Sequence, residues 1–91
     1  MNVIEELEKS LPDFERLLNE NDLRRFAACD YESLRTCFPE IGEAVRRELL
    51  ARDFTLYGGL RAMGFAGTED MCDFIVKYLY AKKRADFSLE A

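Results

Sequence analysis

The side chains that could do chemistry in this chain are three thiols and many carboxylates, and no imidazole accompanies them. The cysteines are Cys29, Cys37 and Cys72. They show no C-x-x-C spacing, and the 91 residues contain no histidine. Histidine is the commonest base that activates a thiol and the commonest metal ligand, so both kinds of site lack their usual partner. We predict no catalytic residue, no metal site and no cofactor, and a carboxylate-pair enzyme stays open as an alternative.

The cysteine count and the N-terminal residues bear on the compartment. An odd number of cysteines without a disulfide framework favours free thiols in a reducing environment. The first residues lack the basic start and apolar run of a signal peptide. No apolar run approaches the ~18 residues that span a bilayer. We expect a soluble cytoplasmic protein that does not enter a membrane.

The stretch from Thr68 to Arg84 carries the clearest helix signal and must position much of the rest. Thr68 is a suitable N-cap, and acidic residues follow it where the helix dipole favours negative charge. Lys82, Lys83 and Arg84 place positive charge at the other end. One apolar stripe with helical spacing consists of Met71, Phe74, Ile75, Tyr78 and Leu79. This spacing predicts a helix over about 68–84.

The remaining pattern predicts short helices and no strand. We expect helices over 3–10 after an Asn2 cap, from Pro12 to about 19, after Asn21 or Asp22, from Asp30 to Phe38, over 39–52 and over 53–63. Ser10-Leu11-Pro12 is expected to break the first of these, and Leu17 to face inward in the second. Gly42 costs helix propensity, so a close helix–helix contact would explain it. Gly64 is a good residue to end the sixth helix.

These elements predict an all-α fold with one compact domain over 1–85. It is a bundle of six or seven mostly short helices packed on the long C-terminal helix. Residues 86–91 are expected to form a flexible tail.

The net charge of −5 is unevenly placed. Residues 1–32 hold nine acidic and four basic side chains, whereas residues 33–91 hold nine of each. An acidic first third suits solubility or docking on a basic partner surface. It argues against a general duplex binder, which needs many cationic contacts. We predict a protein partner with a basic surface.

Acidic and aromatic residues are the candidates for that partner surface. The aromatics are those that the periodicity does not place firmly inside, because aromatic residues concentrate at the energetic centres of interfaces. The candidate partner-binding residues are Glu5, Glu6, Glu8, Phe54, Tyr57, Phe65 and Tyr80.

A nucleic-acid-binding module is the alternative. Two short helices before a longer one are compatible with a helix-turn-helix arrangement. Its basic patch would consist of Arg46, Arg47, Arg52 and Arg61. The protein could also imitate DNA and block a DNA-binding partner, or self-associate, so that both a monomer and a homodimer stay open.

Two resemblances add to this reading. Met63-Gly64-Phe65 resembles the loop with which ubiquitin-associated domains bind ubiquitin, but too little chain follows for that family's third helix, and we interpret this match as coincidental. Residues from about Ile4 to Tyr80 resemble a bacterial family of small helical domains of unknown function. The matching residues are Asp22-Leu23, Phe26-Ala27, Ile41-Gly42-Glu43, Arg46, Leu49-Leu50, Leu56, Leu60, Gly64, Glu69-Asp70-Met71 and Ile75. That family tends to have tryptophans, which this chain lacks. It also tends to have a His-Pro pair at the positions of Gly67-Thr68. The second resemblance implies an all-helical fold and no known activity.

The leading hypothesis is therefore a non-enzymatic protein–protein interaction module. It would be a small acidic inhibitor, antagonist or adaptor of a bacterium or its phage, and it would block or recruit its partner by docking.

Overall fold

The computed structural model describes residues 3–52 and 54–90. At positions 31, 35, 37, 89 and 90 it describes the backbone and not the side chain. Within these ranges the fold is all-α and contains no strand, as predicted. The expected cap at Asn2, the helix start at Asp53, the thiol of Cys37 and the last tail residue Ala91 lie outside the described part.

The first helix is longer than predicted. Helix α1 (Val3–Glu15) runs through Pro12 without a break. Leu7, Leu11 and Phe14 lie on one face of α1 and are buried, whereas Pro12 is exposed. A proline inside a helix costs ~3 kcal/mol, so burial of the three large side chains must outweigh that cost. The predicted break and the separate helix from Pro12 are therefore wrong.

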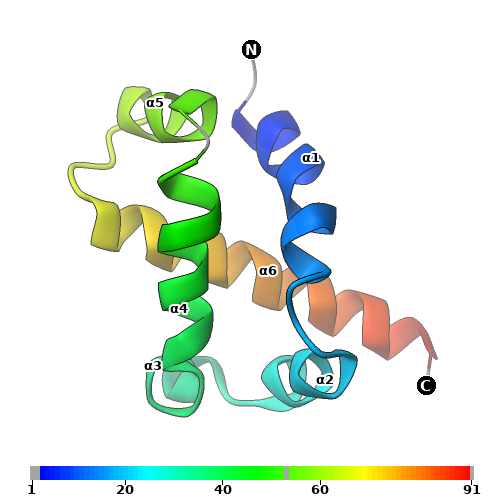
Figure 1. The fold of residues 1–91 in the computed structure, drawn as a ribbon. Helices are drawn as coiled ribbons and strands as arrows, with labels where there is room; N and C mark the ends of the chain where they lie inside the picture. Colours follow the sequence, from blue (N-terminus) through cyan, green and yellow to red (C-terminus); the bar gives the residue numbers. More distant parts are fainter. Residues whose placement is uncertain (1–2, 53, 91) are drawn as a thin grey trace.

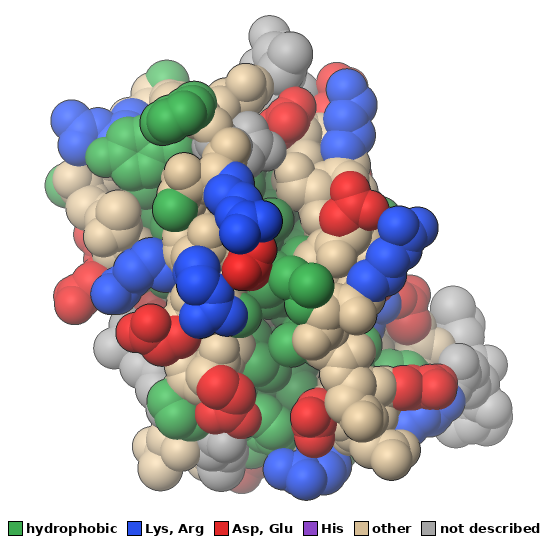
Figure 2. Space-filling view, viewed as in Figure 1, with side chains coloured by type: hydrophobic (Ala, Val, Ile, Leu, Met, Phe, Trp, Pro, Cys, Tyr) green, Lys and Arg blue, Asp and Glu red, His purple; other side chains and the backbone are tan. Residues whose placement is uncertain are grey.

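Leu17 also differs from expectation. It was expected to face inward, but it follows the end of α1 and is 60% exposed. It borders a furrow between α1 and the helix opposite, together with Phe14 and Leu49. Figure 2 shows hydrophobic atoms along this furrow.

The next elements turn the chain at one end of the molecule. Helix α2 (Glu20–Ala28) is capped by Asn19, whose side-chain oxygen accepts a 2.7 Å bond from the amide of Asn21. The predicted caps, Asn21 and Asp22, lie inside the helix instead. A 3-10 turn, η1 (Tyr31–Ser33), leads into the short helix α3 (Leu34–Cys37), which ends before Pro39 as expected.

The predicted helix over 39–52 has two parts. Helix α4 (Pro39–Val45) continues directly into a π-helical segment, η2 (Arg46–Leu50). The wider turn is closed by the amide of Ala51, which donates to the carbonyl of Arg46 at 3.0 Å. Pro39 occupies the first turn, where no amide is needed for a helical bond.

Helix α5 (Phe54–Ala62) ends as the glycine pattern predicts. Gly64 has a φ of 106°, a conformation that strongly favours glycine. The amide of Phe65 donates to the carbonyl of Leu60, and the amide of Gly64 donates to that of Arg61. These two bonds form a Schellman motif, which directs the loop over 65–67 into the last helix.

Helix α6 (Thr68–Glu90) is the platform of the fold and is six residues longer than predicted. It begins at Thr68 itself, so Thr68 is the first helical residue rather than the cap. The backbone of residues 86–90, predicted as a tail, is helical. Met71, Ile75 and Leu79 are fully buried along its inner face.

The arrangement follows from burial against this platform. In Figure 1, α1 and α4 lie side by side across α6, with α5 at one end and α2 and α3 at the other. The molecule measures 37 × 25 × 20 Å along its principal axes. Every described helix of nine residues or more places large apolar side chains in one shared core.

Candidate partner-binding site

The most exposed aromatic residue of the predicted partner surface is Phe54, at the start of α5. Its side chain is 83% exposed, and Tyr57, one turn later, is half-buried. Met63, just beyond the end of α5, is 54% exposed. Figure 2 shows hydrophobic side chains gathered over α5 at the upper left. Phe54 is therefore accessible at the start of α5, whereas Tyr57 packs partly against the core.

Two of the predicted acidic residues lie in the turn of α1 that packs against α5. Glu5 is exposed and Glu6 is half-buried, both in the first turn of α1. That turn lies against α5, because Val3 lies close to the backbone of Gly59. Figure 2 shows acidic side chains at this end of α1, separated by other atoms from the hydrophobic gathering over α5. We call the exposed side of α5 with Phe54 and Tyr57, together with the first turn of α1 that packs against α5, the α5 surface.

Glu8 points elsewhere. Its carboxylate accepts hydrogen bonds from the hydroxyl of Tyr78 and the ammonium of Lys82, both on α6. The bond from Lys82, followed by that from Tyr78, holds the pKa of Glu8 below its usual value. The same bond to Glu8 raises the pKa of Lys82. Glu8 thus ties α1 to α6 and stands apart from the α5 surface.

The other two aromatic candidates are engaged in packing. Phe65 is half-buried and its ring lies 5.2 Å from that of Phe74. Tyr80 is 5% exposed and its ring meets Phe26 edge to face at 5.6 Å. Its hydroxyl donates to the carbonyl of Cys29. Tyr80 is therefore part of the core, and we do not retain it in the partner surface.

The four arginines of the alternative nucleic-acid patch each have a partner within the protein. Arg46 lies 4.0 Å from Glu43, and Arg47 and Arg52 each lie 3.1 Å from Glu48. Arg61 donates to the carbonyl of Ala66 at 3.4 Å. Arg46 faces α6, whereas Arg52 lies beside α1. The structure does not bring these two arginines into one patch.

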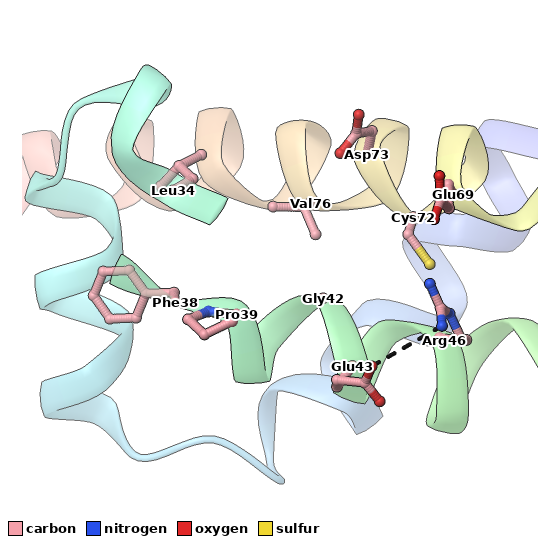
Figure 3. Close-up of a pocket in the computed structure, with 10 residues that line it drawn as sticks. All are labelled: Leu34, Phe38, Pro39, Gly42, Glu43, Arg46, Glu69, Cys72, Asp73 and Val76. Atoms are coloured by element: carbon pink, nitrogen blue, oxygen red, sulfur yellow. Dashed lines mark ion pairs between the residues drawn. The ribbon is translucent and has the colours of Figure 1, made fainter. Parts of the chain in front are cut away.

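A pocket that the sequence reading missed lies between α4 and α6. We call it the α4–α6 pocket, and it encloses about 250 Å³. Leu34, Phe38 and Val76 supply apolar walls. Gly42 leaves the α4 side open, because a Cβ there would meet no atom within 4 Å. Figure 3 shows α4 and α6 facing one another across this space.

The expected close contact at Gly42 is therefore wrong. The close helix–helix approach occurs at Gly59 instead, and Gly42 borders an opening. The signal for the pocket was a glycine on the same helical face as Phe38 and Arg46. Spacing alone cannot distinguish a glycine that admits a neighbouring helix from one that leaves a space.

Charged groups surround the apolar walls of the pocket. Three carboxylates and one guanidinium line it, namely Glu43, Glu69, Asp73 and Arg46. Figure 3 shows the guanidinium of Arg46 and the thiol of Cys72 pointing toward one another. Burial raises the pKa of Cys72, and the hydrogen bond with Arg46 offsets only part of that effect. The thiol therefore stays protonated near neutral pH.

Comparisons with known proteins add no relative to this picture. No family model matches the chain, and neither the curated proteins nor the solved structures contain a significant match. The two resemblances drawn from the sequence stay predictions. None of the helices in the described ranges is both long and apolar enough to cross a membrane.

Proposed function

We propose that this protein is a non-enzymatic interaction module that docks through the α5 surface onto a partner protein with a basic surface. It would act as a stoichiometric inhibitor, an antagonist or an adaptor. The proposal is supported by a surface that combines exposed aromatic area with carboxylates. Both kinds of group suit recognition of another protein.

The observation that carries the proposal is the 83% exposure of Phe54. Full burial of one phenylalanine is worth about 1.5–3 kcal/mol, yet this ring faces solvent. Phe14 and Phe26 are almost completely buried in the core. An exposed aromatic residue beside a half-buried Tyr57 is typical of the residues that anchor an interface.

The charge of the α5 surface favours a basic partner. Glu5 and Glu6 lie in the first turn of α1, which packs against α5, and the chain as a whole carries a net charge of −5. Complementary charge steers association and raises its rate, and salt screens that effect. The partner should therefore bind faster at low ionic strength.

The test is a pull-down with the tagged protein from a lysate of the organism that encodes it, with and without nuclease, in which captured proteins are identified by mass spectrometry. Wild type should retain one stoichiometric partner, and Phe54→Ser should lose it. Leu17→Ser is the matched control, because Leu17 is also exposed but does not belong to the α5 surface. Equal recovery with all three proteins would refute the α5 surface as the docking site. Loss with Leu17→Ser alone would place docking at the furrow beside α1.

Two further results would replace the proposal. Recovery of nucleic acid that disappears with nuclease would favour the arginine-based alternative. A dimer in size-exclusion chromatography with light scattering that Phe54→Ser converts to a monomer would assign the α5 surface to a second copy of this chain.

A further inference from the structure

We infer that the α4–α6 pocket receives a lysine or arginine side chain of the partner protein. The inference rests on the proposed function and names the group that would anchor the partner. It also concerns a second place on the molecule, because none of the residues that line the pocket belongs to the α5 surface.

The size and walls of the pocket fit one long side chain. A volume of about 250 Å³ is too small for a helix and sufficient for a single extended side chain. Leu34 and Phe38 are buried in the wall and Val76 is half-buried. The aliphatic stem of lysine or arginine can bury its methylene groups against such a surface while its charged head stays near water.

The charge at the rim selects a cation. The pocket is lined by three carboxylates and one guanidinium, an excess of two negative charges. Arg46 is hydrogen-bonded to the Cys72 thiol and forms an ion pair with Glu43, so its charge is already neutralised within the protein. Glu69 lies in the first turn of α6 and is exposed. A cationic head at the mouth would be attracted by Glu69, whereas an anion would be repelled by it.

The opening at Gly42 provides both an entrance and a test. A Cβ added at Gly42 meets no atom within 4 Å, so a side chain can start from this position and extend into the pocket space. Gly42→Leu should therefore fill the pocket, and its melting temperature should be equal to or higher than that of the wild-type protein. Gly58→Leu is the matched control, because Gly58 is also helical and unobstructed but lies on α5.

The first experiment uses the full chain and two blocked tripeptides, acetyl-Ala-Arg-Ala-amide and acetyl-Ala-citrulline-Ala-amide. Citrulline keeps the shape of arginine and removes its charge. Titration followed by ¹H–¹⁵N spectra should shift the amides of Gly42, Cys72 and Val76. The arginine peptide should bind about two- to fivefold more tightly, as expected for a partly exposed ion pair, and the difference should vanish in about 0.5 M salt. Glu69→Gln should also remove it, whereas Glu5→Gln should not.

Three results would overturn the inference. They are equal binding of the two peptides, shifts confined to other parts of the chain, and unchanged binding to Gly42→Leu. Gly58→Leu must bind as wild type does.

The pocket and the proposed function can fail separately. If Gly42→Leu retains a captured partner that Phe54→Ser loses, the function stands and the pocket inference fails. If Gly42→Leu loses a partner that Phe54→Ser retains, the pocket is the docking site and the α5 surface fails. If wild type, Phe54→Ser and Gly42→Leu recover the same proteins, both fail.

Discussion

Gly59 of α5 lies so close to Val3 of α1 that a Cβ at position 59 would come within 2.8 Å of the Val3 Cγ2 atom. The Val3 Cβ would lie 3.2 Å away, so rotation of the valine side chain does not remove the conflict. This contact brings the acidic end of α1 beside α5 and thereby assembles the α5 surface.

The two adjacent glycines of α5 should therefore respond oppositely to the same substitution. Gly58→Ala should stabilise the protein by up to about 1 kcal/mol, because alanine favours the helix and meets no atom. Gly59→Ala should be about 1–2 kcal/mol less stable than Gly58→Ala, because the added methyl overlaps Val3. Urea denaturation measures both values. Val3→Ala combined with Gly59→Ala should recover part of the loss, and equal stability of the two single variants would contradict the contact.

Glu8 should make stability depend on pH in the acid range. Its pKa is lowered in the folded protein from the ordinary value of 4.5, because Lys82 and Tyr78 donate hydrogen bonds to its carboxylate. A lowered folded pKa means that the stabilisation is complete above the unfolded pKa and is lost as the pH falls below about 4.5 through the folded pKa. Melting temperatures from pH 7 to pH 3 should fall less steeply for Glu8→Gln. Glu5→Gln is the control, and an identical slope for Glu8→Gln and wild type would contradict the role of this cluster.

The pKa of the Cys72 thiol should lie above that of an ordinary thiol. Burial raises its pKa above 9.0, and the hydrogen bond with Arg46 acts in the opposite direction. In a Cys29→Ser, Cys37→Ser background, the rate of alkylation plotted against pH should have its midpoint above 9.0. Arg46→Gln should move this midpoint higher. A midpoint that moves lower would show that Arg46 does not stabilise the thiolate.

The hydroxyl of Tyr80 should contribute to stability. It donates to the carbonyl of Cys29 and accepts a 2.6 Å hydrogen bond from Arg84. Tyr80→Phe keeps the ring against Phe26 and should cost about 1–2 kcal/mol, because the part-buried carbonyl loses its donor. Arg84→Gln leaves the bond to the Cys29 carbonyl in place and removes the bond and ring contact of an exposed arginine, so it should cost less. Chemical denaturation measures the free energy of unfolding of both variants. If Tyr80→Phe leaves it unchanged, water replaces the hydroxyl.

The features that the sequence predicted correctly are those with several independent local signals. The inner face of α6 agrees in spacing and in the acidic first turn, whereas Lys82, Lys83 and Arg84 lie inside the helix and not at its end. Gly64 marks the end of α5 because the turn favours a positive φ. The all-α fold follows from the same patterns. In the candidate site, the exposure of Phe54 could be anticipated because no apolar stripe includes it.

The features that the sequence missed depend on tertiary packing. Pro12 is a local helix breaker, but three buried residues of α1 override it. Tyr80 could not be placed from the spacing of its own helix, because its partners Phe26 and Cys29 are far away in the chain. The α4–α6 pocket also arises only when two helices meet, so the residues of α4 do not reveal it alone.

The position of α6 in the chain has a consequence for folding during synthesis. It is the last of the described helices to leave the ribosome, yet α2 and α4 both pack against it. Until α6 emerges, the apolar faces of the earlier helices have no platform, and short helices are marginally stable alone. The nascent chain should therefore remain largely uncompacted until α6 has been translated, and a chain that stops at residue 67 should be sensitive to proteolysis.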